Sequence, residues 1–361
     1  MLLGPRQVGK TTLCETILSQ TTSENEIVRW TGDSITDRVL LSVNDLANLR
    51  TYTDNKKIIF IDEAQKIENI GNTLKLLVDF YKDTKQIIIT GSSSINLIDN
   101  TAEPLTGRKS IFLMYPISMS EILLTHDRQA LEGQRTDLMV FGSYPGVLQL
   151  GTREEKISLL KELANSSLYR DILEFQQVRN SDVIMRLLRL LAFQIGQEVS
   201  MNELATQLGI DTKTVERYID LLEKSYIIFR LPPYFTNKRK EISKSKKIYF
   251  YDLGIRNTII GDWNPLMNRQ DVWLLWENMM MIERMKQREY LGKYALTYFW
   301  RTNNWQEIDL IEENAGELHA YEFKWWDKKV SVPTSFWVAY PNNTFELINQ
   351  SNYLQFVLGK I

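Results

Sequence analysis

Residues 4 to 11 read Gly-Pro-Arg-Gln-Val-Gly-Lys-Thr, which fits the phosphate-binding pattern GxxxxGK[ST]. In this pattern the glycines let backbone N–H groups turn toward a β-phosphate, the lysine reaches the β- and γ-phosphate oxygens, and the threonine hydroxyl is suited to bind Mg²⁺. We therefore expect a nucleotide to contact the following loop residues: Gly4, Pro5, Arg6, Gln7, Val8, Gly9, Lys10, Thr11 and Thr12.

An acidic pair, Asp62 and Glu63, follows the apolar run 58–61. Continuous apolar and β-branched residues predict a buried parallel strand, which places Asp62 at its carboxyl end beside the metal. Glu63 is then in position to polarise an attacking water. Together with the loop, the pair predicts Mg²⁺-dependent binding and hydrolysis of ATP, with Lys10 and Glu63 as catalytic residues. The alternative is a chance glycine- and lysine-rich turn followed by an acidic strand end.

Two further segments contain candidates for contacts to the γ-phosphate of a nucleotide. Thr90 or Ser92, at the end of the apolar run 86–90, can hydrogen-bond to it, although a serine-rich loop that caps the next helix explains the same residues. Arg108 precedes another expected strand, where its guanidinium can reach the nucleotide of a neighbouring subunit. This arginine-finger hypothesis implies a homo-oligomer, whereas a surface ion pair is the alternative for a single arginine.

A second group of charged residues falls near the C-terminus. Alternating residues in 296–301, 306–311 and 318–324 predict antiparallel strands, with 312–316 as a connection. The two-residue spacing of Glu322 and Lys324 puts them on one face, and the paired strand can bring Asp309 alongside. Two carboxylates and a lysine suit a Mg²⁺-dependent phosphodiester hydrolase, with Glu277 of the expected helix 272–286 as a third acid. An amphipathic hairpin with a surface ion pair is the simpler alternative.

The middle of the chain carries a nucleic-acid-binding pattern. Residues 202–208, Gly209 and 211–224 predict a helix-turn-helix, and the strand-like segments 226–231 and 247–251 flank a basic segment, 236–247. A winged helix with a basic wing is the expected arrangement, and winged helices bind either duplex DNA or proteins. The expected DNA contacts are Lys213, Arg217, Lys238, Arg239 and Lys240.

Length and composition limit the other possibilities. A chain of 361 residues predicts two or three domains, and 43% hydrophobic with 24% charged residues is typical of globular proteins. The single cysteine, Cys14, excludes an internal disulfide and a cysteine-based zinc site, and two histidines leave little for a histidine cluster. A net charge of −2 requires any DNA binding to come from a local patch. No apolar run approaches the roughly 18 residues of a membrane span, and no signal pattern opens the chain, so we expect a cytoplasmic protein without a membrane partner.

The elements around these motifs alternate in type over the first 150 residues. Strands are expected at 27–30, 58–61, 86–90 and 110–114, with a short one at Met1-Leu2-Leu3, and helices at 11–19, 44–50 and 72–81. This order predicts a parallel sheet covered on both faces. Residues 155–195 are expected to be helical. We expect a P-loop ATPase domain at 1–150, a helical and winged-helix domain at 151–247 and a third domain at 248–361.

These landmarks together resemble the bacterial and archaeal AAA-type ATPases that carry a C-terminal domain named DUF4143. The motifs in order are GPRQVGKTTL, IIFIDEAQKI, IIITGSSS, LTGRKSIFLMYPIS, FGSYPGVL, KSKKIYFYDLGIRN, LWENMMM, EIDLI and AYEFKWW. The resemblance implies an α/β protein: an AAA-like parallel-sheet domain, a winged-helix segment and a restriction-endonuclease-like domain of the PD-(D/E)XK superfamily. It places that superfamily's acids and lysine on Glu277, Asp309, Glu322 and Lys324.

Two functions follow from the sequence. The first is an ATP-driven switch or motor that acts on DNA through the winged helix and the nuclease-like domain, with ATP and Mg²⁺ as cofactors. The second is a signalling or defence scaffold in which ATP sets the assembly state and the C-terminal half binds protein without nuclease activity.

Overall fold

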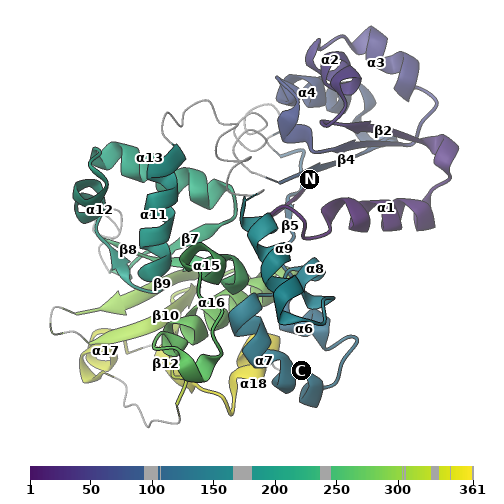
Figure 1. The fold of residues 1–361 in the computed structure, drawn as a ribbon. Helices are drawn as coiled ribbons and strands as arrows, with labels where there is room; N and C mark the ends of the chain where they lie inside the picture. The colour runs from purple at the N-terminus through teal and green to yellow at the C-terminus, as the bar shows by residue number, and fades with distance from the viewer. Residues whose placement is uncertain are drawn as a thin grey trace. The chain divides into compact units, whose positions relative to one another are not determined.

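The computed structural model describes residues 1–92, 105, 107–165, 181–235, 245–302, 304, 306–326, 333–341 and 343–359 (Figure 1). The chain divides into two compact units. The first is Met1–Tyr115 with Lys224–Tyr226, and the second is Pro116–Glu223 with Ile227–Ile361. Among the described residues, no helix is long and apolar enough to cross a membrane.

The first unit contains a five-stranded sheet in the order β2-β3-β4-β1-β5, and every pairing in it is parallel. Because β4 lies between β1 and β3, its carboxyl end separates the loop that follows β1 from the acidic pair that follows β3. The predicted parallel sheet is confirmed. The strands are β1 Leu2–Leu3, β2 Ile27–Thr31, β3 Ile58–Asp62, β4 Gln86–Gly91 and β5 Phe112–Leu113.

Helices cover both faces of this sheet, with α1 on one side and α2, α3 and α4 on the other (Figure 1). Phe60 packs with Cys14 and Leu18 of α1, whereas Ile59 and Ile61, which point to the opposite side of the pleated strand, have no exposed surface. Burial on both faces explains why the strand is apolar throughout. The helices are α1 Lys10–Thr21, α2 Ile35–Ser42, α3 Leu46–Thr53 and α4 Ile70–Tyr81, of which α2 was not expected.

The second unit begins with three helices in residues that we had assigned to the first domain, 1–150: α6 Met119–Ile122, α7 Arg128–Phe141 and α8 Pro145–Leu148. They belong to this unit because α7 packs against α15 (Leu253–Ile260). Asn257 of α15 donates hydrogen bonds to the carbonyl oxygens of Met139 and Val140, at 3.0 and 2.9 Å. A Cβ on Gly254 would lie 2.1 Å from the Phe141 carbonyl oxygen, so only glycine allows this approach.

The predicted helix-turn-helix is confirmed by α12 and α13. Gly209, with φ 69°, ends α12 in the left-handed conformation that favours glycine. A three-stranded antiparallel sheet in the order β6-β8-β7 accompanies the two helices. The bounds are α9 Arg153–Asn165, α11 Ser181–Phe193, β6 Glu198–Val199, α12 Met201–Leu208, α13 Thr212–Lys224, β7 Ile228–Leu231 and β8 Lys246–Phe250.

The C-terminal sheet has the order β12-β11-β10-β9, antiparallel except for the parallel pair of β11 and β12. The turn between β10 and β11 is shorter than the expected connection, because β10 continues to Asn314 and only Ala315 and Gly316, with φ 51° and 85°, reverse the chain. The remaining bounds are α16 Val272–Tyr290, β9 Leu296–Arg301, β10 Glu307–Asn314, β11 Glu317–Phe323, α17 Thr334–Ala339, β12 Asn343–Ile348 and α18 Tyr353–Leu358.

Candidate nucleotide-binding site and carboxylate cleft

Glycine is required at the two glycine positions of the phosphate-binding loop for different structural reasons. A Cβ on Gly4 would lie 2.0 Å from the carbonyl oxygen of Met114, at the end of β5, so a side chain there clashes with backbone. Gly9 has φ 100° immediately before α1, which few other residues adopt. Of the other loop residues, Pro5 and Val8 are buried, whereas Arg6 is partly exposed and Gln7 and Thr12 are exposed.

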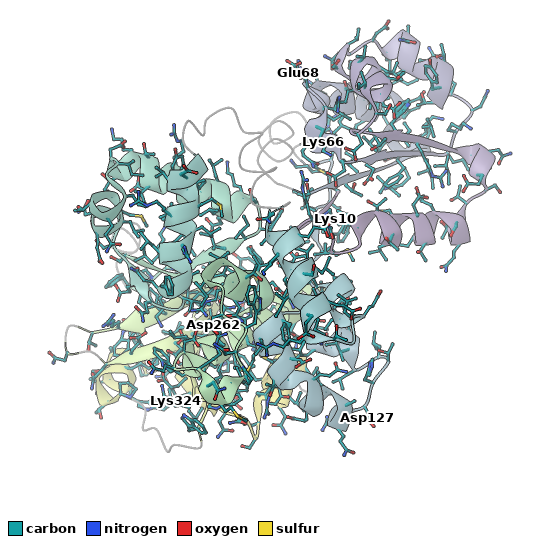
Figure 2. The ribbon with its side chains drawn as sticks, in the orientation of Figure 1. Lys10, Lys66, Glu68, Asp127, Asp262 and Lys324 are labelled. Atoms are coloured by element: carbon teal, nitrogen blue, oxygen red, sulfur yellow. The ribbon has the colours of Figure 1, made fainter. Side chains whose placement is uncertain are left out.

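Lys10, labelled in Figure 2, is the first residue of α1. Its Nζ donates hydrogen bonds to the carbonyl oxygens of Gly4 at 2.9 Å and Pro5 at 2.6 Å. A buried ammonium group at a helix N-terminus is a favourable position for a phosphate. The glycine-lined loop and this cation therefore fit the nucleotide phosphates expected from the sequence.

Thr11 and Asp62, which are 51 residues apart, meet at the edge of the sheet. The Thr11 hydroxyl lies 3.0 and 3.1 Å from the two carboxylate oxygens of Asp62. Thr90, at the end of β4, also donates to Asp62. A hydroxyl and a carboxylate beside a phosphate site are oxygen ligands that Mg²⁺ prefers, so these two residues fit the expected metal.

Glu63 is held by side chains from two elements. The Gln65 side-chain amide donates to Glu63 Oε2 at 2.7 Å and to the hydroxyl of Ser92 at 2.8 Å, and the backbone N–H of Glu63 donates to Thr90 at 3.2 Å. Ser92 is fully buried. The sequence analysis missed Gln65. Its position two residues after the acid, within a turn, was the available signal.

Contacts from the residues that follow β2 also hold the backbone of the acidic pair in place. The N–H of Gly32 donates to the carbonyl oxygen of Asp62 at 2.8 Å, and a Cβ on Gly32 would lie 2.1 Å from the carbonyl oxygen of Glu63. Lys66 forms an ion pair with Asp33. The ends of β2, β3 and β4 are therefore joined around one site.

Arg108 forms an ion pair with Asp79 of α4, and both side chains are about half exposed. This contact matches the surface ion pair that was the alternative to an arginine finger. The pair is within one chain, so it does not test a contact to a neighbouring subunit.

The second unit contains a cleft of about 600 Å³ beside the C-terminal sheet. All four residues expected to form a nuclease-like site line it: Glu277, Asp309, Glu322 and Lys324. Lys324 Nζ lies 2.6 Å from Glu322 Oε1. Trp273 and Trp326 also line the cleft and are 53% and 69% exposed.

β10 contains a β-bulge against β9 next to Asp309. In the pairing of β10 with β9, Ile308 is opposite Trp300 and Ile311 is opposite Tyr298, so one extra residue is present between them. Ile308 and Ile311 both pack in the apolar core of the sheet. Asp309, next to Ile308, accepts a hydrogen bond from the Phe323 backbone N–H at 2.8 Å, which connects it to β11.

Lys247 of β8 is the central cation of the cleft, and the sequence analysis counted it only as part of the basic segment. Its Nζ lies 3.1 Å from Glu277 Oε1, 2.5 Å from Glu307 Oε1 and 3.7 Å from Asp309 Oδ1, and its side chain is 3% exposed. Burial opposes its charge, but these carboxylates raise its pKa well above the usual value.

Two acids that line the cleft, Glu277 and Glu322, have raised pKa values, the opposite direction to most paired carboxylates. Burial raises the pKa of Glu277 to about 7, although Lys247 and Tyr249 partly offset it; the Tyr249 hydroxyl donates to Glu277 Oε1 at 2.6 Å. Burial, followed by the charge of Asp309, raises the pKa of Glu322 to about 7, with Lys324 opposing the shift.

These residues do not fit the expected divalent cation. Glu277 accepts from Lys247 and Tyr249, Asp309 accepts from Phe323, and Lys247 lies among the carboxylates. Across the described ranges, no group of three or more aspartates, glutamates, histidines or cysteines is arranged to hold a metal. We therefore derive no metal-dependent step for this cleft.

The expected DNA-binding residues lie only partly in the described structure. Lys213 and Arg217 are exposed on α13, but so are Glu216 and Asp220 on the same helix. The helix surface therefore carries both charge signs. The expected wing contacts Lys238, Arg239 and Lys240 lie outside the described residues.

The loop, the parallel sheet and the acidic pair define a P-loop nucleotide-binding protein. Residues 1–123 match the AAA domain family and residues 274–345 match DUF4143, a domain of unknown function. The chain thus has the domain order in which a match to the AAA domain family precedes a match to DUF4143. Residues 133–265 match a further domain of unknown function, DUF8612, which the sequence analysis did not identify.

Similar proteins occur in bacteria and archaea. An uncharacterized protein of Mycobacterium tuberculosis is 27% identical over 327 residues, covering 90% of this chain and 69% of that protein. One of Methanocaldococcus jannaschii is 26% identical over 329 residues, covering 86% of this chain and 71% of that protein. Among solved structures, the Aeropyrum pernix ORC1 protein in complex with DNA matches with a TM-score of 0.33 and 13% identity, covering 72% of this chain and 86% of that one.

Proposed function

We propose that the chain is a Mg²⁺-dependent ATPase whose nucleotide state controls the second unit. The observation that carries this proposal is the set of side-chain contacts at the carboxyl edge of the parallel sheet. Thr11 contacts Asp62 at 3.0 Å, and Glu63, the next residue, is held by Gln65. These are the positions needed for a metal ligand, its carboxylate partner and a residue that orients water.

Each residue of this site has a separate task in the proposal. Lys10 and the loop N–H groups bind the β- and γ-phosphates, and Thr11 and Asp62 hold Mg²⁺, which neutralises developing charge on the phosphates. Glu63 accepts a hydrogen bond from the attacking water. Ser92, through Gln65, connects the orientation of Glu63 to the end of β4.

We also propose that Arg108 acts on the nucleotide of a neighbouring copy in a homo-oligomer. Arg108 forms an exposed ion pair with Asp79, so its guanidinium lies at the surface. This surface position is the observation that supports a contact to a neighbouring copy. An exposed ion pair is worth little, so exchange of Asp79 for a phosphate costs little.

For the second unit, we propose action on DNA through a winged helix formed by α11 to β8. The order of elements supports it: a helix, a short strand, two helices separated by a glycine turn and two antiparallel strands. Lys213 and Arg217 supply phosphate contacts, together with the wing residues Lys238, Arg239 and Lys240. We infer a nuclease-like fold for the C-terminal sheet with α16, without proposing cleavage.

The scaffold function is the second candidate, and the mixed charge on α13 favours it. A DNA-binding surface is expected to be basic, whereas Glu216 and Asp220 add negative charge beside Lys213 and Arg217. In this case ATP sets the assembly state and the C-terminal half binds protein.

One experiment separates the two candidates. The ATPase rate of the full chain is measured with and without duplex DNA at two salt concentrations, and particle size is measured with and without ATP. DNA stimulation that weakens at high salt supports the DNA-directed function. A change in particle size with ATP but no response to DNA supports the scaffold. No ATP hydrolysis under any of these conditions contradicts the proposal as a whole.

A further inference from the structure

The cleft of the second unit contains a lysine where a metal-dependent phosphodiesterase needs a cation. Lys247 Nζ lies within 4 Å of carboxylate oxygens from three residues on two elements: Glu277 of α16, and Glu307 and Asp309 of β10. The Lys247 side chain also lies over the Phe299 ring, with Nζ 5.5 Å from its centroid. The ammonium group is thus enclosed by acids and an aromatic face.

Because these charged side chains are buried, the fold requires the lysine to lie among the carboxylates. The side chains of Lys247, Glu277 and Asp309 are 3%, 6% and 9% exposed, so water cannot compensate their charges. Buried carboxylates that face one another repel unless a cation lies between them. Lys247 supplies that cation, and β8 holds it because the strand pairs with both β6 and β7.

A second lysine that lines the cleft repeats the pattern. Lys324 contacts Glu322 Oε1 at 2.6 Å, and Glu322 Oε2 is buried without a hydrogen-bond partner. The acids that the sequence suggested as metal ligands are therefore balanced by the ammonium groups of the chain itself.

We propose that Lys247 replaces the divalent cation in this cleft, so that the domain retains a nuclease-like acidic site as a metal-free, lysine-neutralised centre. Mg²⁺ and Mn²⁺ do not bind there in the natural protein, and loss of the lysine charge creates a divalent-cation site. This inference does not depend on the ATPase, which uses residues of the first unit.

The test measures Mn²⁺ binding to the full chain in an Asp62→Asn background, which removes the carboxylate expected to assist metal binding at the nucleotide loop. Free Mn²⁺ is followed by electron paramagnetic resonance in four proteins: the background, and the background with Lys247→Met, Lys246→Met or Asp309→Asn. Lys246 is the matched control because it is the neighbouring lysine of β8, is partly exposed and loses the same charge.

We expect Lys247→Met to bind one additional Mn²⁺ ion per chain, with a melting temperature that falls in EDTA and recovers with Mn²⁺. Lys246→Met and Asp309→Asn should bind as many ions as the background. Equal binding by Lys247→Met and the background overturns the proposal. The background and Asp309→Asn arms remain decisive if Lys247→Met does not fold. A metal ion bound by the background and lost with Asp309→Asn shows that the cleft already holds one, whereas no difference between them supports the proposal.

Discussion

Gln65 holds the carboxylate of Glu63 in place, with its amide nitrogen 2.7 Å from Glu63 Oε2 and 2.8 Å from the hydroxyl of Ser92. The two residues are separated by one position in the chain, and Glu63 has φ 49°, so the turn itself brings them together. The contact joins the end of β3 to the end of β4. We therefore expect a change at Ser92 to alter the direction of the Glu63 side chain.

The first prediction concerns the two steps of nucleotide use. Glu63→Gln keeps the size of the side chain but removes its charge, so ATP binding should remain while turnover falls by about 100-fold or more. Lys10→Ala should lose binding, because the phosphates lose their buried cation. Fluorescent-nucleotide titration and phosphate release measure the two steps. Turnover by Glu63→Gln at the wild-type rate would remove the water-orienting role.

The second prediction tests the positioning of Glu63 by Gln65. Gln65→Ala should lower kcat by roughly 10- to 100-fold with little change in KM, since misplacement of a catalytic group affects the transition state more than binding. Gln86→Ala is the control, because Gln86 is exposed at the start of β4. A rise in KM without a change in kcat assigns Gln65 to nucleotide binding instead.

The third prediction tests Arg108 across subunits. Mixing Arg108→Ala protein with Glu63→Gln protein should restore part of the activity that each lacks alone, because one interface in a mixed assembly then contains both residues. ATPase rates are measured over a range of mixing ratios, with sedimentation to follow assembly. An active enzyme that stays monomeric contradicts the hypothesis.

The fourth prediction compares two glycine substitutions. Gly4→Ala should destabilise the first unit, since its Cβ would lie 2.0 Å from a carbonyl oxygen, and about 2 kcal/mol or more is expected for such a clash. Gly133→Ala should stabilise the second unit by about 0.5–1 kcal/mol, because Gly133 is in α7 with open space around its Cα. Thermal unfolding checks both. A stable Gly4→Ala protein contradicts the loop geometry.

The fifth prediction is a pH dependence of stability. Arg256 and Arg269 contact Asp271 at 2.6 and 2.8 Å, and although burial opposes ionisation they lower its pKa to about 2. Since this is below the unfolded value of about 3.9, the stabilisation is complete above about pH 4 and is lost as the pH falls through 2.

Asp271→Asn should therefore cost about 2 kcal/mol at pH 7 and progressively less below pH 4. Denaturant unfolding at pH 7, 4 and 3 measures the difference. Asp182→Asn, at an exposed position of α11, is the control and should change stability by less than about 0.5 kcal/mol. A constant difference at all three pH values contradicts the role of the Asp271 charge.

The nucleotide loop and the acidic pair could be predicted from the sequence because their chemistry depends on local spacing. Gly4, Gly9, Lys10 and Thr11 lie within eight consecutive residues, and the strand that ends at Asp62 is apolar because both of its faces are covered. The helix-turn-helix was predictable for the same reason, since Gly209 and the period of its helices are local signals.

Only the tertiary structure decided which charged residue lies among the acids of the cleft. The position of Asp309 beside Glu322 and Lys324 was expected from strand spacing, whereas the bulge that shifts β10 by one residue against β9 has no spacing signal in a single strand. From the sequence alone, Lys247 is indistinguishable from the other cations of the basic segment 236–247. Sheet pairing directs its side chain into the interior, next to Glu277, 30 residues away in sequence. Long-range pairing determines such contacts, because the free energy of a buried charge depends on the neighbours that the fold supplies.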